Sequence, residues 1–517
     1  MLKPKSPQAS FLGSWIYDRI VLQDHLLRKI NQVVDFSFVR ELLKDRYTPN
    51  FGRPAEDPEF MLRLCLLQYL YGDSDRQAIE NARVNLAYKY FLGLAVDEDV
   101  PDDTTISYFR AIRLGEDKFK QVFQQVVQQC MESGLVTGKR QIIDSTHIVA
   151  DMAINSLSGL IKLCRRNVIQ DVSRQSADVA NKLGMTEPSI RKQDRFTRVE
   201  EGLEQEVADA SKLLDGVTEE LKQGTLKANP ELARSLELLE KAVADRADGA
   251  EDRLVSPVDP DARAGKKTSK SWAGYKGHVV MEEESEIITA VETTPANKAD
   301  GNQLKPLLKQ QEEALQVVPQ ELSADKAYGS GANLEHLGSK SITGYIGLID
   351  KVNHIDHAFF TVTDFHYDIT KETVTCPAGC TAVYHRRATF HTDKLKRNGY
   401  VFQFSPSQCN SCQLKHKCHK SNRGRSVHIS YYDPVVRQMR ERMESESGKE
   451  AYRNRYKVEH KVADLARYCN MRRCRYRGLT RAKIHTLLSA TVSNIKRMAK
   501  LLWKAPKPCP EITMIAC

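Results

Sequence analysis

Three acidic residues, far apart in the chain, occupy segments whose patterns predict different local structures. Asp144 lies in the β-branched run Gln141-Ile-Ile-Asp-Ser-Thr-His-Ile-Val, which is typical of a strand. Asp325 closes a second short strand, Glu321-Leu-Ser-Ala-Asp, and Glu459 stands in a basic helical stretch. Carboxylates from two strands and a helix can converge on Mg²⁺ or Mn²⁺, and a pair of such ions drives phosphoryl transfer. We therefore predict that Asp144, Asp325 and Glu459 are catalytic and hold two divalent ions.

The helical spacing around Glu459 adds two residues to this predicted site. Tyr452, Arg455 and Glu459 are three and then four residues apart, which places them on one face of a helix. Arginine suits a phosphate and tyrosine suits stacking, so both are predicted to bind DNA. Simpler interpretations exist for single residues, because an Asp after a strand commonly caps a turn and Glu459 could merely pair with Arg455. The three acids taken together favour the metal site.

The distribution of charge supports a nucleic-acid partner more than the total does. Lys and Arg number 77 against 67 Asp and Glu, which gives a net charge of +10 and a pI near 8.9. The surplus is modest, but basic residues crowd the C-terminal quarter beside Glu459. Among them, Arg467, Arg472 and Arg473 are predicted to contact DNA phosphates.

Hydrophobic periodicity predicts an α/β core with helical additions. Residues from about 14 to 135 read as helices, including one that begins after Asp57-Pro58 and stops at Gly72, and a second from about Arg76 to Leu92. From about 139 the period changes to that of strands, which alternate with helices and predict a mixed sheet. A charged, amphipathic stretch after the first strand predicts a helical hairpin that turns between Gly224 and Pro230.

Five cysteines cluster between residues 376 and 418: Cys376, Cys380, Cys409, Cys412 and Cys418. A C-x2-C pair is the commonest half of a tetrahedral zinc site, which takes four ligands. We favour Cys376, Cys409, Cys412 and Cys418 as ligands of one structural Zn²⁺ and leave Cys380 spare.

Two histidines and a metal-free loop are the alternatives for this cluster. His416 and His419 could each replace a cysteine as a ligand, and the irregular spacing also fits a degenerate knuckle without metal.

No stretch approaches the roughly 18 apolar residues of a spanning helix, and the start of the chain lacks the apolar segment of a signal peptide. We therefore expect a cytoplasmic, nucleoid-associated protein that has no membrane partner.

These motifs resemble those of bacterial insertion-sequence transposases of the DDE class. Asp144-Ser-Thr-His, Asp325-Lys-Ala-Tyr and Tyr452-x2-Arg455-x3-Glu459 match the three signature regions of that family. Gly274-Tyr-Lys-Gly-His-Val matches its second strand, and Gly52-Arg-Pro and Pro101-Asp-Asp-Thr-Thr resemble the helical domain of one branch. The third signature often continues to a lysine seven residues after the glutamate, where this chain has Ala466 followed by Arg467.

The resemblance implies a ribonuclease H-like fold and a division of the chain. The expected parts are a helical DNA-binding or dimerisation domain (1–135), a catalytic core (139–350) with a helical insert (155–255), a cysteine-rich insert (351–430), the C-terminal helices of the core (431–503) and a tail (504–517). The implied activity is metal-dependent cleavage of double-stranded DNA at the terminal inverted repeats of a mobile element. Strand transfer of the freed 3′-hydroxyl ends into target DNA would follow, with water as the first nucleophile and the 3′-hydroxyl as the second.

Two ends must be brought together, so a homodimer or a higher assembly is expected. A catalytically inactive DNA-binding protein derived from a transposase is the alternative, although the retention of all three acids argues against it. A metal-dependent nuclease without strand transfer is a third interpretation, for which the inserts and the N-terminal helices would be superfluous.

Overall fold

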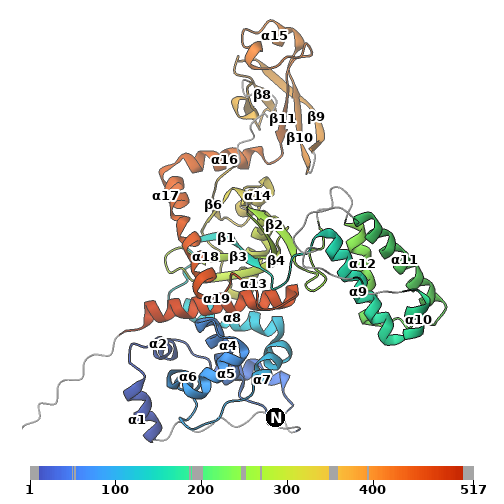
Figure 1. Ribbon diagram of the computed structural model, residues 1–517. Helices are drawn as coiled ribbons and strands as arrows, with labels where there is room; N and C mark the ends of the chain where they lie inside the picture. Colours follow the sequence, from blue (N-terminus) through green and yellow to red (C-terminus); the bar gives the residue numbers. More distant parts are fainter. Residues whose placement is uncertain are drawn as a thin grey trace, which may run out of the picture.

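The computed structural model describes residues 11–48, 51, 54–184, 188, 202–245, 252–267, 270–348, 359–392 and 395–504. A mixed sheet occupies the middle of the molecule, with the N-terminal helices below it, a helical insert at one side and a small β-sheet module at the far end (Figure 1). Of the predicted tail from 504 onward, only Lys504 belongs to the described residues. Among the described helices, none is long and apolar enough to cross a membrane.

The central sheet has the strand order expected of a ribonuclease H-like core. Its strands are β1 (Arg140–Val149), β2 (Arg263–Lys267), β3 (Lys270–Glu282), β4 (Ile288–Pro295), β5 (Glu321–Ala324) and β6 (Thr343–Ile346). β3 pairs antiparallel with β1, β2 and β4, whereas β5 runs parallel to β1, and β6 parallel to β5. The mixed α/β fold class predicted from the sequence is confirmed.

One glycine allows β3 to approach β1 closely. Gly274 has a φ of 150°, and a Cβ atom there would lie 2.2 Å from the carbonyl oxygen of Ile148. A side chain would therefore force the two strands apart where Gly274 pairs with Val149.

The N-terminal region is helical, as predicted. It contains α1 (Phe11–Ile20), α2 (Leu26–Val33), α3 (Phe38–Leu42), α4 (Pro58–Tyr71), α5 (Asp75–Val84), α6 (Leu86–Leu92), α7 (Asp103–Tyr108) and α8 (Gly115–Glu132), with short 3₁₀ and π turns at Lys44–Arg46 and Phe109–Leu114. Asp57 caps α4 by accepting the Glu59 N–H at 2.8 Å, and Gly72 ends that helix at a φ of 84°. The single helix predicted from Arg76 to Leu92 is wrong, because the Asn85 side chain caps a new helix there.

The N-terminal helices share one hydrophobic core with the sheet. α19 (Leu479–Leu502) runs between them and packs against α2, α4, α8 and β4. Buried residues such as Leu66, Phe123, Ile142 and Leu488 belong to the same cluster. Burying this much apolar surface holds the N-terminal helices firmly on the sheet.

The opposite face of the sheet is covered by a second group of helices. These are α13 (Leu304–Leu315), α14 (Gly331–Ser339) and α16 (Asp433–Glu444), which bury side chains such as Leu307, Leu334 and Met439. α17 (Glu446–Asn454) and α18 (Tyr456–Tyr468) then lead to α19. The remaining short turns of the core are Asp300–Gln303 and Lys326–Tyr328.

The two inserts have hydrophobic cores of their own. The helical insert consists of α9 (Leu157–Gln175), α10 (Ala177–Lys182), α11 (Leu203–Lys222) and α12 (Pro230–Ala244), and α11 and α12 form the predicted hairpin. The cysteine-rich module has the five-stranded antiparallel order β11 (Ser426–Ser430), β10 (Leu395–Gln403), β9 (Thr381–Thr392), β8 (Thr373–Thr375) and β7 (His366–Asp368). It also contains α15 (Pro406–Asn410) and 3₁₀ turns at Val362–Asp364 and Lys415–Lys417.

Candidate active site

The register of two parallel strands places the first two predicted acids side by side. Ile143 of β1 pairs with Ala324 of β5, so Asp144 and Asp325 are the next residues on neighbouring strands. Asp325 caps the following 3₁₀ turn by accepting the Ala327 N–H at 2.9 Å. The turn-capping interpretation is therefore correct for Asp325, and the cap also fixes this carboxylate beside Asp144.

Asp144 is largely buried, and its environment disfavours the charged form. Its side chain is 16% exposed, and Oδ1 accepts the Ser145 N–H at 2.7 Å. Burial raises the pKa of the Asp144 carboxyl to about 6, and the nearby Asp325 raises it as well, while Arg455 and Lys267 act in the opposite direction. A further cation close to both carboxylates would favour their ionised forms.

Arg455 links the third acid to the first. Its Nη1 lies 3.7 Å from Oδ2 of Asp144, and its Nη2 donates to Oε1 of Glu459 at 2.5 Å. Arg455 is 19% exposed and Glu459 is 53% exposed, so the bridge reaches from the sheet to the surface. Two of the acids, Asp144 and Glu459, thus meet at one guanidinium group, and the third, Asp325, lies beside Asp144.

The helix that carries these residues is not continuous. α17 ends at Asn454 and α18 begins at Tyr456, so the helical stretch predicted around Glu459 is divided into two helices. Arg455 forms the junction and keeps an αR backbone, with its guanidinium 5.7 Å from the Tyr452 ring. Because the junction is nearly helical, Tyr452 and Glu459 still flank Arg455 as the spacing predicts.

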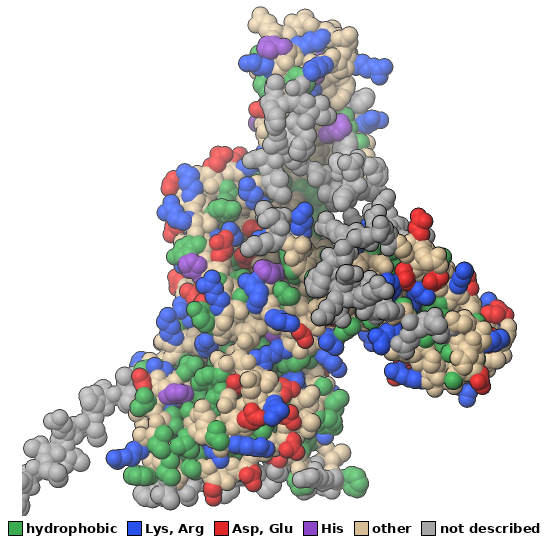
Figure 2. All heavy atoms as spheres, in the orientation of Figure 1, with side chains coloured by type: hydrophobic (Ala, Val, Ile, Leu, Met, Phe, Trp, Pro, Cys, Tyr) green, Lys and Arg blue, Asp and Glu red, His purple; other side chains and the backbone are tan. Residues whose placement is uncertain are grey.

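The remaining predicted DNA contacts lie outside this cluster. Arg472 is exposed and contacts the ring of His147, whereas Arg473 pairs with Asp151 at 2.8 Å. Arg467 is exposed on α18, about two turns beyond Glu459. On the face that Figure 2 draws, many Lys and Arg side chains lie on the central part of the molecule, with Asp and Glu among them.

Not every Lys or Arg side chain in the basic C-terminal segment is available to a ligand. Arg475 donates to the backbone carbonyls of Gln68 and Asp73 in the N-terminal helices. Lys483 pairs with Glu116 and Glu292 at 3.1 and 3.3 Å. These cations join parts of the molecule, which the local sequence pattern could not reveal.

A fourth acid beside the site was missed by the sequence interpretation. Asp300 accepts the Ser145 hydroxyl at 2.9 Å and pairs with Lys276 at 2.8 Å. The only signal was its place shortly after a strand, where polar residues are common. Asp300 also acts with Asp144 on the buried Tyr328, whose pKa burial raises well above its usual value.

All five clustered cysteines come together in the β-sheet module, including Cys380, which was expected to be spare. They line one pocket with the buried His419, whereas His416 is exposed and its Nδ1 donates to the backbone carbonyl of Gln413 at 3.0 Å. Within the part of the chain that the structure describes, no group of three or more His, Cys, Asp and Glu side chains is already close enough to hold one metal ion.

Comparison with known families gives two matches. Residues 15–111 match the model described as Transposase domain (DUF772), and residues 244–495 match the one described as Transposase DDE domain. The second match includes Asp325, Arg455 and Glu459, whereas Asp144 lies between the two matched segments. No solved structure matches the chain.

Proposed function

Because this chain belongs to the DDE transposases of insertion sequences, we propose that it cuts double-stranded DNA at the terminal inverted repeats of a mobile element and joins the freed 3′ ends to target DNA. The observations that support this proposal are the register that sets Asp144 beside Asp325 and the ion pairs of Arg455 with Asp144 and with Glu459. Transposases of this class use divalent ions such as Mg²⁺ or Mn²⁺. The finer assignment, with two ions at these three acids, is part of our proposal.

The donor set fits such ions. Carboxylate oxygens are the ligands that Mg²⁺ prefers, and it keeps several waters, so a few carboxylates suffice. The raised pKa of Asp144 reflects a carboxylate that is buried beside another acid, which is the arrangement a cation would stabilise. When bound, a pair of divalent ions sharpens the attacking oxygen and offsets charge on the leaving oxygen.

The chain's own residues would position the acids and the DNA. Arg455 holds Asp144 and Glu459 near each other and can contact a phosphate, with Tyr452 beside it. Arg467, Arg472 and Arg473, which are exposed, would bind the DNA backbone. We further propose a dimer or a higher assembly that holds two ends, and a location with the nucleoid.

The test is cleavage and joining of a labelled duplex that carries the element's own end, with Mg²⁺, with Mn²⁺ and with EDTA. We expect metal-dependent nicking and a joined product, and we expect Asp325→Asn to abolish both while it leaves end binding largely intact. Asp368→Asn, an acid paired with Lys371 in the cysteine-rich module, is the matched control and should cut normally.

Other results of this cleavage experiment would favour one of the two other candidate functions. Specific binding by the native chain without any cutting would favour the inactive DNA-binding protein. Cutting without joining would favour a simple nuclease. Undiminished cutting by Asp325→Asn would show that the assignment of the acids is wrong.

We also propose that the cysteine-rich module holds one structural Zn²⁺, which would be separate from the ions at the acids. Its role would be to fix the fold of the module, because a closed set of thiolate ligands leaves no open position for chemistry.

A further inference from the structure

The cysteine-rich module carries almost all of the net charge of the chain. Residues 376–430 contain ten Lys and Arg side chains and a single acid, Asp393, so they supply nine of the ten surplus positive charges. The rest of the chain has 67 Lys and Arg against 66 Asp and Glu and is nearly neutral. A concentration of one sign of charge attracts a polyanion and steers it to one place. The module is therefore a candidate surface for nucleic acid in its own right.

The strand pairing sorts the side chains of the module's sheet onto two faces. Arg386 of β9, Val401 of β10 and His428 of β11 are direct partners, and paired residues on neighbouring strands point to the same side. The adjacent row, which holds Arg387 and Ile429, points to the opposite side. Ile429 is buried in the hydrophobic core of the module, so the row of Arg386 forms the outer face of the sheet. Arg386 and His428 are exposed on that face.

This outer face continues to the turn that precedes β11. Gln403 pairs with Ser426 two residues further along the same face, and its Nε2 donates to the backbone carbonyl of Arg423 at 2.9 Å. Ser426 and Arg423 are both exposed. The outer face therefore presents Arg386, Arg423, Ser426 and His428 to solvent.

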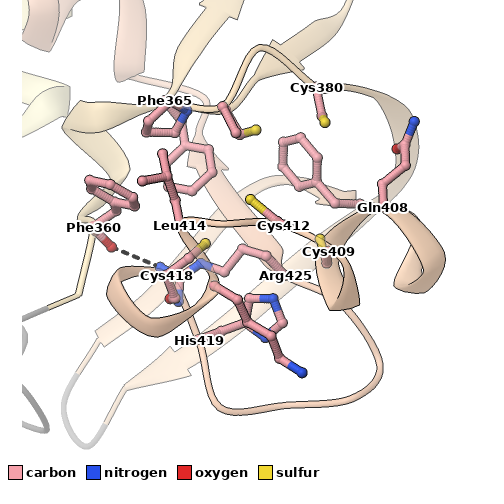
Figure 3. A pocket seen from close by; sticks show the side chains of 15 residues that line it. Phe360, Phe365, Cys380, Gln408, Cys409, Cys412, Leu414, Cys418, His419 and Arg425 are labelled. Carbon is pink, nitrogen blue, oxygen red and sulfur yellow. Dashed lines mark hydrogen bonds between the residues drawn. The ribbon is translucent and has the colours of Figure 1, made fainter.

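A neighbouring arginine, Arg425, serves the module itself. It lines the pocket of the cysteines (Figure 3) and donates to the backbone carbonyls of Phe360 and Cys418, each at 3.1 Å. Within the part of the chain that the structure describes, Arg386 and Arg423 have no carboxylate partner. Two positive charges of the outer face are thus available to an anionic ligand.

The residue types of the outer face suit phosphates more than bases. Arginine and serine side chains are common partners of DNA phosphates, and such contacts position a duplex without reading its sequence. The described helical segments of the module have only five or three residues, so none is long enough to lie in a major groove and present several base contacts. The outer face therefore fits DNA whose sequence varies.

α16 holds the module at a fixed place relative to the acids. Its Arg437 donates to the Phe365 carbonyl of the module at 3.1 Å, and its Arg442 donates to the Gly344 carbonyl of β6 at 3.2 Å. α16 and α17 have 12 and 9 residues, so at most about 32 Å of helix separates the module from Arg455. One turn of duplex DNA is about 34 Å, so one duplex is long enough to contact both. In Figure 1 the central sheet lies between the module and the N-terminal helices.

We propose that this outer face binds the phosphate backbone of target DNA and so presents the target to the acids for joining. The inference rests on the proposed strand transfer, because a target is needed only if ends are joined. The contact itself depends on charge and not on the divalent ions, so it can be measured without any cutting.

The first test measures binding of the full-length chain to a labelled duplex of random sequence that lacks an element end, without Mg²⁺ or Mn²⁺ and over a range of salt concentrations. We expect Arg386→Gln/Arg423→Gln to bind more than about tenfold more weakly at about 0.1 M salt and to lower the salt slope by about two. Arg387→Gln is the matched control, because this neighbour is also exposed but points to the opposite side, and its affinity should stay within about twofold.

A charge-conserving variant separates a lost contact from a damaged fold. Arg386→Lys/Arg423→Lys keeps both positive charges and should keep a nearly native salt slope. A loss that persists in this Lys variant, an unchanged slope in the Gln variant, or an equal loss in Arg387→Gln would each overturn the inference.

The second test measures joining of a pre-cut end, which carries a free 3′-hydroxyl, to a separate target duplex in Mg²⁺. The Gln variant should need more than about tenfold more target for half-maximal joining, while its cutting of an intact end duplex stays unchanged. An equal loss of binding to the end duplex would assign the outer face to the element end and overturn the target. A native chain that joins no DNA would overturn the proposed function and the target with it, whereas the salt slope would still show whether the outer face binds DNA.

Discussion

A buried histidine joins the N-terminal helices to the core, and it should make this junction sensitive to acid. His485 of α19 is fully buried, and its Nδ1 lies 2.8 Å from the hydroxyl of Tyr69 in α4. Burial lowers the pKa of His485 to about 3, and the nearby Arg475 lowers it further. The folded protein therefore keeps this ring neutral under conditions where an unfolded chain would protonate it.

The sign and size of the effect follow from this difference in pKa. An unfolded histidine takes up a proton as the pH falls through about 6.5, whereas the folded one does so only near pH 3. Stability is therefore fully present above about pH 6.5 and is lost progressively down to about pH 3. At about pH 5 the stability lost corresponds to one and a half pKa units, or about 2 kcal/mol of the free energy of unfolding.

The assay is denaturant unfolding of the full chain at about pH 7.5 and at about pH 5, followed by hydrogen exchange in peptides from α4 and α19. His485→Gln has no ring to protonate, so we expect it to be less stable at neutral pH but to lose about 2 kcal/mol less on acidification than the native chain. His460→Gln is the matched control, because that histidine is exposed on α18. Equal acid losses in the native chain and in His485→Gln would refute the reasoning.

Three further predictions concern packing and charge elsewhere in the molecule. Gly274→Ala should destabilise the chain by roughly 2–4 kcal/mol in thermal unfolding because of its close approach to β1, whereas Gly338→Ala, with open space around it, should be nearly neutral. Arg110→Met should lower the free energy of unfolding by about 3 kcal/mol, because the half-buried carboxylate of Asp75 loses the guanidinium that binds it at 2.9 Å. A loss below about 0.5 kcal/mol would contradict this. Arg473→Ala should weaken end binding uniformly across DNA sequences and lower the salt slope by about one, and an unchanged slope would remove it from the interface.

The elements that carry the site could be predicted because their signals are local. The β-branched run around Asp144 and the short strand before Asp325 identify strands without knowledge of the rest of the chain. Their parallel pairing then places the two acids in register. The spacing of Arg455 and Glu459 likewise survives, because an i,i+4 pair needs only about one helical turn.

The features that were missed depend on contacts between distant segments. Asp300 joins the site only because the fold brings it to Ser145, and no local pattern distinguishes it from other polar residues after strands. The helix break at Arg455 leaves every helical spacing intact, so periodicity cannot detect it. Arg475 belongs to the same basic C-terminal segment as the predicted DNA contacts, yet it donates to carbonyls of α4 and of the segment after it. Long-range partners decide the role of each of these residues.

The charge of the predicted site gives Arg455 an electrostatic role in addition to contact with a phosphate. Three carboxylates and one guanidinium leave two negative charges among Asp144, Asp325, Glu459 and Arg455, which a single divalent ion would balance. A second divalent ion would leave the site positive, and the phosphates of bound DNA can compensate that excess. If two ions bind at these acids as proposed, a site of this charge would take up the second ion fully only with DNA present, and cutting would be restrained in the absence of an element end. The guanidinium of Arg455 would set this dependence on DNA, because without it the acids alone would attract a second ion more strongly.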